Sequence, residues 1–361
     1  MSRKPKGPLR KGWTTGACAT AAASAAYRAL LTGRFPDPVT IRLPKGESPS
    51  FPLSRAELAN GHATAGIVKD AGDDPDVTHG AEIVATVAPG AQGSGVTFRA
   101  GEGVGTVTRP GLVLAVGEPA INPAPRKMMA AAIQAIAREH SAAGDVTVTI
   151  AIPGGEELAK KTMNGRLGIV GGLSVLGTTG IVIPYSCSSW IHSIHRGVDV
   201  ARAAGLVHVA AATGKTSEAA VQKLYNLPEI ALIDMGDFCG GLLKYLAKKP
   251  IAKLTLAGGV GKISKLAQGH LDLHSSDSRV DMAGLASLLA ALGADAATVA
   301  KARAANTASE VFEIAATRDF PLGDLIAKRA REVALATVGG GTAVEVVIFD
   351  RQGRLVGRAG D

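Results

Sequence analysis

The sequence predicts an α+β N-terminal domain over residues 1–194, followed by a smaller α/β domain with a parallel sheet over residues 195–361. Three observations support this division. The length of 361 residues exceeds that of a typical single domain. In the first half, short β-like segments are separated by Gly, Pro and Asp, which is typical of a mostly antiparallel sheet. In the second half, apolar strands alternate with helices, as in parallel sheets with right-handed crossovers.

The first domain begins with a basic arm over residues 1–13, which we expect to be flexible. Alanine then fills a predicted helix that ends near Leu31, with Thr15 as its cap and Gly33 beyond its end. A second helix is expected at Ala124–Glu139. The strands of this domain are expected at Val39–Leu43, Ala63–Val68, Ala81–Val87, Val96–Arg99, Leu112–Val116 and Val146–Ile152.

Three apolar segments of the second domain each end in a glycine-bearing loop that leads into a helix. Because parallel sheets bind ligands beyond the carboxyl ends of their strands, these loops are the expected ligand site. A helical stretch covers residues 282–338 with interruptions, and Val344–Phe349 forms a last strand before a polar tail. The three segments are Leu206–Ala212 before residues 213–216, Ile230–Ile233 before residues 235–237, and Leu254–Leu256 before residues 258–262.

Charge and composition restrict the partners. The chain carries 39 Lys and Arg against 31 Asp and Glu, a net charge of +8 with neutral histidine, which suits an anionic partner. Only 2 Trp, 4 Tyr and 7 Phe are present and no basic motif is interleaved with them, which argues against nucleic acid. No run approaches the roughly 20 apolar residues of a membrane helix, so no membrane partner is expected. No heptad pattern is visible, and the oligomeric state stays open.

The three cysteines, Cys18, Cys187 and Cys239, lie far apart and form no CxxC motif, which excludes a zinc knuckle and a thioredoxin motif. An odd number of cysteines without a disulfide framework is typical of a reducing cytosol, so a cytoplasmic location is expected. The basic N-terminus and the alanine-rich residues 17–26 loosely resemble a signal peptide, but Thr20 and Ser24 favour a helix of a soluble domain.

An acidic segment at residues 69–80 is the first candidate site. Four carboxylates, a lysine and a histidine follow one another closely there, and repulsion between carboxylates is expected to raise the pKa of at least one of them. This makes Asp70, Asp73 and His79 candidates for acid–base work. The spacing does not match an EF-hand calcium loop. The alternative is an acidic turn, since Asp and Pro favour turns.

Two glycine-rich segments, at residues 101–111 and 165–180, form the second candidate. A backbone that passes close to an anion or to a flat ligand would explain so many glycines, and a glycine-rich hairpin is the alternative. Arg109 lies in the first segment, and Arg166 is the only charge in the second. Arg126 and Lys127 follow Pro125 in the first turn of a helix, where they face either a carboxylate ligand or solvent.

The loop at residues 214–216 has the Gly-Lys-Thr ending of a Walker A motif, but Val209 stands where a P-loop requires glycine. Together with a Walker B-like strand at residues 230–234, it keeps a nucleotide-triphosphatase as an alternative. The same turn and helix N-terminus can hold any anion, including an amino-acid carboxylate. His270 and His274 would share one helix face as a metal pair, but Gly269 weakens a helix there, and a polar wall of a site is favoured.

Taken together, six segments resemble the cobalt-precorrin-5B C1-methyltransferase family, the CbiD family of corrin-ring synthesis. They lie in family order over nearly the whole chain, although the region after about residue 290 carries little of the resemblance. The segments are TTGACA at residues 14–19, KDAGDDPDVTHG at 69–80, GEGVGTVTRPG at 101–111, GEPAINPAPR at 117–126, MNGRLGIVGGLSVLGTTGIV at 163–182 and AGGVGKISKLAQGH at 257–270.

The resemblance implies methyl transfer from S-adenosylmethionine to ring carbon C1 of cobalt-precorrin-5B, giving cobalt-precorrin-6A and S-adenosylhomocysteine. It also implies an α+β domain joined to a small parallel α/β domain. The ring carbon is the nucleophile, so the protein mainly orients the reactants, and no protein-bound metal or covalent nucleophile is required. The sequence leaves open whether the natural substrate carries cobalt. A non-catalytic tetrapyrrole carrier, which needs no donor site, is the competing class.

Residue roles under this resemblance are hypotheses drawn from the chemistry. The substrate carries acetate and propionate groups, which suit cationic side chains, and a carboxylate or histidine can handle a ring proton. Asp237 is expected to bind the ribose hydroxyls or the ammonium group of the donor. The catalytic candidates are Asp70, Asp73 and His79; the substrate-binding candidates are Arg109, Arg126, Lys127, Arg166 and Lys262; the donor-binding candidates are Thr213, Gly214, Thr216, Gly236, Asp237, Gly258, Gly259 and Gly261.

Overall fold

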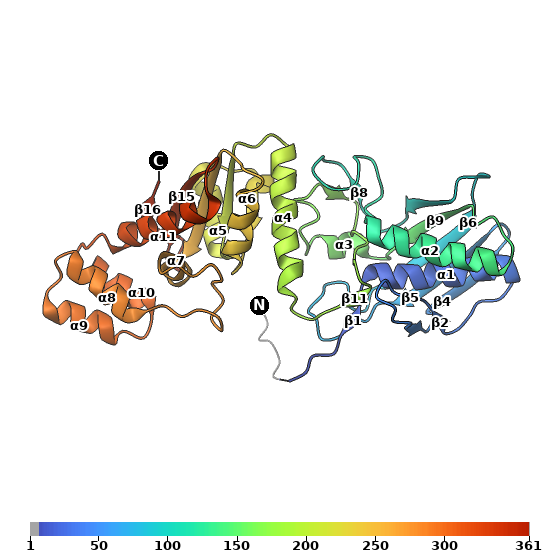
Figure 1. The fold of residues 1–361 in the computed structure, drawn as a ribbon, viewed down its shortest axis with the longest axis horizontal. Coiled ribbons are helices and arrows are strands. Elements are labelled where there is room, and N and C mark those ends of the chain that lie inside the picture. Colours follow the sequence, from blue (N-terminus) through green and yellow to red (C-terminus); the bar gives the residue numbers. More distant parts are fainter. Residues whose placement is uncertain (1–6, 361) are drawn as a thin grey trace. The chain divides into compact units, whose positions relative to one another are not determined.

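The computed structural model describes residues 7–360 and divides the chain into two compact units, Met1–Ser186 and Cys187–Asp361. Figure 1 shows the elements of both units. The division lies before the expected boundary at residues 194 and 195, because helix α4 (Cys187–Ala203) runs unbroken across that boundary within the second unit. Among the described residues, no helix is both long and apolar enough to span a membrane.

The first unit is built on a five-stranded sheet. In spatial order its strands are β4 (Arg55–Ala59), β5 (His62–Val68), β6 (Glu82–Pro89), β9 (Val146–Ala151) and β7 (Val96–Ala100). Only β7 and β9 pair in parallel, so the mostly antiparallel sheet is confirmed. Strand β4 was not predicted, because all five of its residues are exposed and no apolar alternation marks it.

Helix α1 (Thr15–Thr32) lies in the core between β5, β6 and helix α2 (Pro123–Glu139). Its cap is Thr14, one residue before the expected position, and the Thr14 side chain accepts a hydrogen bond from the N–H of Ala17. Gly33 ends the helix in the left-handed conformation, as expected. Every residue from Thr15 to Tyr27 is buried, and the small side chains let both neighbours approach closely.

Short strand pairs tie together the loops of the first unit. They are β1 (Gly12–Trp13) with β11 (Ile181–Val182), β8 (Thr106–Val107) with β10 (Ile169–Val170), and β2 (Val39–Thr40) with β3 (Ser50–Phe51). The unit also contains the short helix α3 (Gly155–Ala159). The expected strand at Leu112–Val116 is wrong. The chain turns back there, so that the N–H of Gly117 donates to the carbonyl of Val107 at 2.8 Å and Val113 is 71% exposed.

The basic arm is attached to the unit along its last residues, contrary to the expected flexibility. Strand β1 pairs with β11, and the N–H of Trp13 donates to the carbonyl of Asp70 at 2.7 Å. The Trp13 ring also packs edge-on against Phe51, with ring centres 5.5 Å apart. Residues 1–6 of the arm lie outside the described residues.

The second unit also holds a five-stranded sheet. In spatial order its strands are β13 (Leu232–Asp234), β12 (His208–Ala212), β14 (Lys253–Gly259), β15 (Ala343–Phe349) and β16 (Leu355–Ala359). The first four are parallel, as predicted, but the expected polar tail forms the antiparallel strand β16. In this strand the guanidinium of Arg358 lies 2.7 Å from Oε1 of Glu345, so the tail supplies a counter-charge to a carboxylate with only 1% of its side chain exposed.

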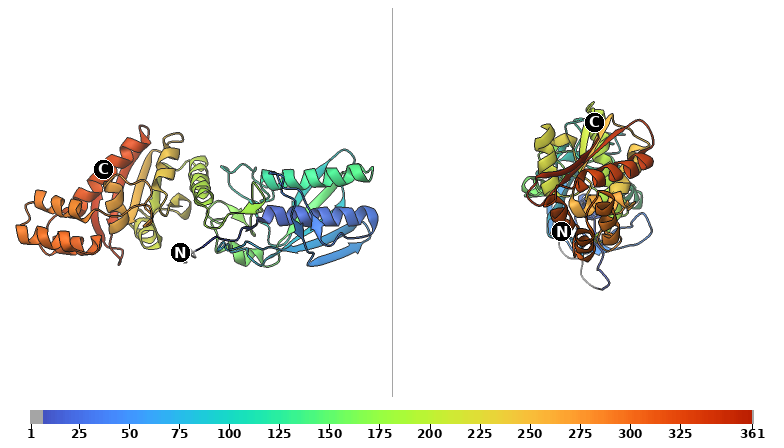
Figure 2. Two further views of the ribbon diagram at one scale, coloured as in Figure 1. Left: turned by 60° about the horizontal axis from the view of Figure 1, so that its bottom comes forward. Right: turned by 90° about the vertical axis from the view of Figure 1, so that its left-hand side faces the viewer.

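Helices cover both faces of this sheet. Helix α5 (Lys215–Tyr225) packs on one face, and α4, α6 (Cys239–Leu246), α7 (Val260–Ala267) and α11 (Leu322–Val338) pack on the other. The alternating residues of β12 divide between the two cores, as a strand covered on both sides requires. The remaining helices are α8 (Met282–Ala291), α9 (Ala296–Ala304) and α10 (Ala308–Ala316), drawn in orange in Figure 2, and the short 3₁₀ helix η1 (Glu229–Ala231) before β13.

Candidate functional site

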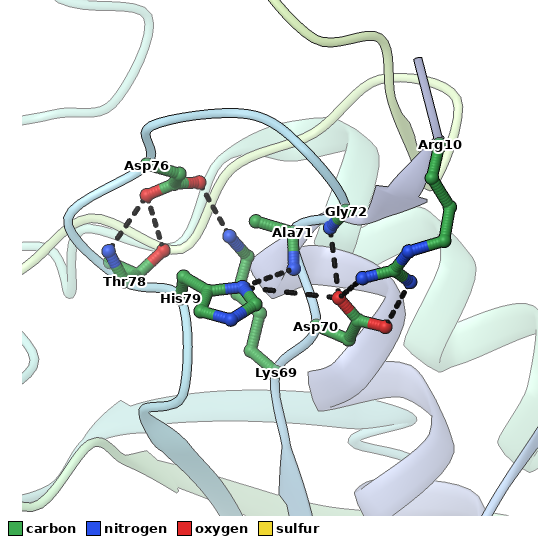
Figure 3. Close-up of polar contacts among 8 residues, drawn as sticks. All are labelled: Arg10, Lys69, Asp70, Ala71, Gly72, Asp76, Thr78 and His79. Atoms are coloured by element: carbon green, nitrogen blue, oxygen red, sulfur yellow. Dashed lines mark hydrogen bonds and ion pairs between the residues drawn. The ribbon is translucent and has the colours of Figure 1, made fainter. Parts of the chain in front are cut away.

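The acidic segment at residues 69–80 follows β5 and folds over a buried charge (Figure 3). Nζ of Lys69, whose side chain is 1% exposed, donates to Oδ2 of Asp76 at 2.5 Å. The other oxygen of Asp76 accepts from the N–H and the hydroxyl of Thr78 at 2.8 and 2.7 Å. The segment therefore neutralises the buried charge of Lys69 with its own Asp76, and this ion pair holds the segment in its folded shape.

The other three carboxylates also have partners. The guanidinium of Arg10 donates to Oδ1 of Asp70 at 2.8 Å, and the backbone N–H of Arg10 donates to Oδ2 of Asp73 at 2.6 Å. The N–H of Tyr185 donates to Oδ1 of Asp74 at 2.8 Å. These bonds attach the segment to the arm before β1 and to the loop after β11. They favour the alternative that the segment is a structural acidic turn.

The expected rise in pKa is wrong for Asp70 and Asp76. Hydrogen bonds from Arg10 and from a backbone N–H lower the pKa of Asp70 to about 2. Burial raises the pKa of Asp76, but the charge and hydrogen bond of Lys69 outweigh burial and lower it overall. The carboxylates face cations and N–H groups, so their ionised forms are stabilised.

His79 lies beside this turn with 53% of its side chain exposed. Its Nδ1 accepts a hydrogen bond from the N–H of Ala71 at 3.1 Å and lies 3.9 Å from Oδ1 of Asp70. A ring nitrogen that accepts an N–H carries no proton, so the neutral ring holds its proton on Nε2. In this arrangement His79 offers a hydrogen-bond donor to a ligand.

The glycine-rich segments pass close to other backbone, which differs from the expected approach to a ligand. A Cβ on Gly103 would lie 2.0 Å from the carbonyl oxygen of Ile152, and one on Gly172 would lie 2.2 Å from that of Gly103. Strands β8 and β10 pair here, and the bridge between Val104 and Leu173 continues the contact. Several of these glycines are therefore needed for chain packing.

Substitution of Gly172 tests this explanation. We expect Gly172→Ala to lower the free energy of unfolding by about 2 kcal/mol, because the added methyl group overlaps a carbonyl oxygen that cannot move freely. Gly165→Ala is the matched control, since a Cβ there meets nothing within 4 Å and the change should stay within about 0.5 kcal/mol. Urea denaturation measures both. Equal stability of the two variants would contradict the packing role.

The cationic candidates of the first unit differ in their surroundings. Arg126 is held internally: it donates to the carbonyls of Ile121 and Pro119 at 2.7 and 3.1 Å and lies 2.9 Å from Oε2 of Glu118. Arg166 is half-buried, whereas Arg109 and Lys127 are exposed. The stem of Arg109 lies over Gly168, where a Cβ would approach it to 2.7 Å. The structure thus gives Arg126 a structural role and leaves the charged ends of Arg109 and Lys127 accessible.

In the second unit, the three predicted loops meet at one edge of the sheet. Strand β13 lies on one side of β12, and the chain then crosses to form β14 on the other side of β12. The direction of winding therefore reverses between β12 and β14. Open parallel sheets bind ligands beyond their carboxyl ends at such a point. The N–H of Thr213 donates to the carbonyl of Ala257 at 2.9 Å, and a Cβ on Gly258 would lie 3.1 Å from the Thr213 side chain.

Lys262 crosses this edge from the helix that follows β14. Its Nζ donates to the carbonyl oxygen of Thr213, after β12, at 2.7 Å. The same Nζ lies 3.0 Å from Oδ1 of Asp237, after β13. Asp237 is 8% exposed, and its Oδ1 receives no aligned hydrogen bond despite the nearby cation. Lys262, expected among the substrate ligands, thus lies among the predicted donor ligands.

Backbone N–H groups face the same edge. Helices α5, α6 and α7 have their N-caps there, at Gly214, Phe238 and Gly259, and none of the three has a side-chain cap, but in α6 the N–H of Gly240 already donates to the carbonyl of Leu271 at 2.8 Å. The first N–H groups of a helix have no partner within the helix, so they can bind a carboxylate or a hydroxyl group. A Cβ on Gly214, Gly259 or Gly261 would meet nothing within 4 Å.

Two side chains of this region were not predicted. The indole of Trp190 on α4 packs against Gly236, donates to the carbonyl of Asp234 at 3.2 Å and lies beside Phe238. Lys265 is 8% exposed and donates to the carbonyl of Leu273 at 2.8 Å. Its position three residues after Lys262, on one helix face, is a signal that was present in the sequence. Trp190 gave no such signal, because only the fold brings it to the loop.

The comparisons with known proteins cover nearly the whole chain. The CbiD family profile matches residues 1–184, and the profile of the CbiD C-terminal domain matches residues 272–360. Proteins named cobalt-precorrin-5B C(1)-methyltransferase are 61% identical in Paramagnetospirillum magneticum, over 97% of this chain and 98% of that protein, and 59% identical in Brucella anthropi, over 98% and 96%. A third, from Bradyrhizobium sp., is 60% identical over 97% of this chain and 94% of that protein.

Among solved structures, the cobalamin biosynthesis protein (cbiD) from Archaeoglobus fulgidus aligns at 28% identity with a TM-score of 0.40, covering 71% of this chain and 78% of that one. The family profiles and the three full-length relatives agree with the resemblance carried by the sequence motifs. On these matches, the chain belongs to the CbiD family.

Proposed function

We propose that this protein methylates C1 of cobalt-precorrin-5B with S-adenosylmethionine, giving cobalt-precorrin-6A and S-adenosylhomocysteine in corrin-ring biosynthesis. The observation that carries the proposal is the identity of about 60% with cobalt-precorrin-5B C(1)-methyltransferases along almost the entire chain. All three cysteines are free thiols, and one is exposed, which suits a reaction in the cytoplasm.

We place the donor at the carboxyl edge of the second sheet. When bound, the donor supplies a methyl group on a sulfonium, and the electron pair of the broken C–S bond stays on sulfur. The residues present suit its amino-acid part: the buried Oδ1 of Asp237 lacks an aligned hydrogen-bond donor, and the uncapped N-termini of α5 and α7 can bind a carboxylate. Of the other donor-binding candidates, Thr213, Gly214 and Gly236 follow strands β12 and β13, Gly258 and Gly259 end β14, and Thr216 and Gly261 lie in the first turns of α5 and α7.

We place substrate carboxylates on cationic side chains of the first unit. Arg109 and Lys127 are candidates because their side chains are exposed, and Arg166 because it is the only charge in its glycine-rich segment, whereas Arg126 binds internal carbonyls and Glu118. For a ring proton, His79 is a better candidate than Asp70 or Asp73, because both carboxylates are bound to Arg10. The exposed Nε2–H of His79 can donate a hydrogen bond or a proton, whereas Nδ1 already accepts from the N–H of Ala71.

We expect Arg109→Ala and Arg166→Ala each to raise the dissociation constant of the tetrapyrrole about 10-fold, the value of one charge-assisted hydrogen bond. Arg126→Ala should act differently and lower thermal stability, because it removes internal contacts of the chain. Titration of the tetrapyrrole absorbance gives the first quantity and thermal unfolding gives the second. If Arg109→Ala and Arg166→Ala both bind the tetrapyrrole as tightly as the wild type, these two arginines do not bind the substrate carboxylates.

The experiment that tests the function uses methyl-labelled S-adenosylmethionine and cobalt-precorrin-5B with the purified protein. Mass spectrometry should find one labelled methyl group on the ring, and fragmentation should place it at C1. A tetrapyrrole that binds without transfer, together with no donor binding, would favour a non-catalytic carrier. Binding of magnesium-ATP in place of both ligands would favour the P-loop-like alternative.

A further inference from the structure

The ammonium group of Lys262 has an unusual pair of partners at the sheet edge. It binds one backbone carbonyl oxygen, that of Thr213, at 2.7 Å, and one buried carboxylate oxygen, Oδ1 of Asp237, at 3.0 Å. The two acceptors come from the ends of two neighbouring strands, while the lysine comes from the helix after the third. The side chain therefore spans the point where the sheet topology reverses.

The same two acceptors suit the α-ammonium group of an amino acid. An ammonium group carries three N–H donors and no acceptor, so a carbonyl and a carboxylate at this spacing are complementary to it. Oδ1 of Asp237 is buried and receives no aligned hydrogen bond, although Nζ of Lys262 lies 3.0 Å away. A Cβ on Gly214, which follows Thr213, or on Gly259 would meet nothing within 4 Å, so there is open space beside the Thr213 acceptor.

We propose that Lys262 competes with the α-ammonium group of the methyl donor for the carbonyl of Thr213 and the carboxylate of Asp237. This inference rests on the donor site proposed above. Donor binding exchanges one cation for another at Asp237, so the buried carboxylate stays paired throughout. The side chain of Lys262 is 36% exposed, which leaves it a path into solvent when it is displaced.

If Lys262 competes with the donor, its removal should tighten donor binding, whereas removal of a direct ligand would weaken it. Lys262→Met keeps most of the apolar stem and removes the competing charge, so it should tighten S-adenosylhomocysteine binding about 2- to 5-fold, the value of a partly exposed ion pair. The affinity for 5′-methylthioadenosine, which lacks the amino-acid part, should not change. Lys215→Met is the matched control, because it removes a charge at the same edge without freeing either acceptor, and it should not tighten binding.

A second measurement follows the lysine itself. Acetic anhydride should label Lys262 faster in the wild-type protein when S-adenosylhomocysteine is present, because the displaced amine enters solvent. Protection of Lys262 by the ligand, or weaker binding in Lys262→Met, would overturn the competition and make Lys262 a direct ligand. These outcomes leave the proposed function intact, whereas a wild-type protein that binds no S-adenosylhomocysteine would overturn both.

Discussion

The variant Asp76→Asn should lose about 3 kcal/mol of the free energy of unfolding, because it leaves the ammonium group of Lys69 without a counter-charge. The Lys69 side chain is only 1% exposed, so water cannot replace the lost carboxylate. The amide oxygen of the substituted side chain can still accept from Thr78, which confines the change to the ion pair. Urea denaturation at pH 7 measures the loss.

Adding Lys69→Met to this variant provides the control. The double variant removes both charges and should regain most of the lost stability, since an apolar side chain suits the buried position of Lys69.

The stability that the Asp76 carboxylate contributes should depend on pH in one direction. The pKa of Asp76 is lowered in the folded protein, so its contribution is present above the unfolded value of about 3.9 and is lost as the pH falls through the folded value. The stability difference between wild type and Asp76→Asn should shrink below about pH 4, and a difference independent of pH would contradict the ion pair.

The second large effect is expected at the donor site. Asp237→Asn should weaken S-adenosylhomocysteine binding roughly 30-fold, because the variant removes the charge that faces the donor ammonium group. The free energy of unfolding should change little by comparison, since Lys262 keeps its hydrogen bond to Thr213. Isothermal titration calorimetry measures the affinity.

Asp272→Asn is the control, because it removes one carboxylate charge from the second unit at a position away from the proposed donor site. Asp272 is exposed in the same unit and accepts a hydrogen bond from the N–H of His274, outside the three strand-end loops. Its variant should bind S-adenosylhomocysteine as the wild type does. If Asp237→Asn binds as tightly as this control, the donor's ammonium group does not lie at Asp237.

The second unit was largely predictable because its local patterns and its fold agree. Strands covered on both faces are continuous apolar runs, and the glycine loops after them mark the carboxyl edge of the sheet. The sequence therefore located the loops that meet at Thr213, Asp237 and Gly258. It did not locate Trp190, because nothing in the alternation of strands and helices indicates which side chain of α4 reaches Gly236.

The first unit was less predictable because distant segments determine its loops. Glycines at residues 101–111 and 165–180 suggested a ligand, but Gly103 and Gly172 contact each other's backbone across about seventy positions of the chain. The pKa of Asp70 moved opposite to the expectation for the same reason, whereas the pKa of Asp76 is lowered, against the effect of burial, by Lys69 within the same segment. Local spacing predicts repulsion between carboxylates, whereas Arg10 comes to Asp70 only through the folded arm.

The pairing of β1 with β11 has a consequence for the nascent chain. Gly12 and Trp13 are made early, but their partners Val182 and Ile181 emerge only when the first unit is almost complete. At about 5–20 residues per second, the first strand waits on the order of ten seconds or more for its partner. We therefore expect the first unit to fold while the second is still being synthesised.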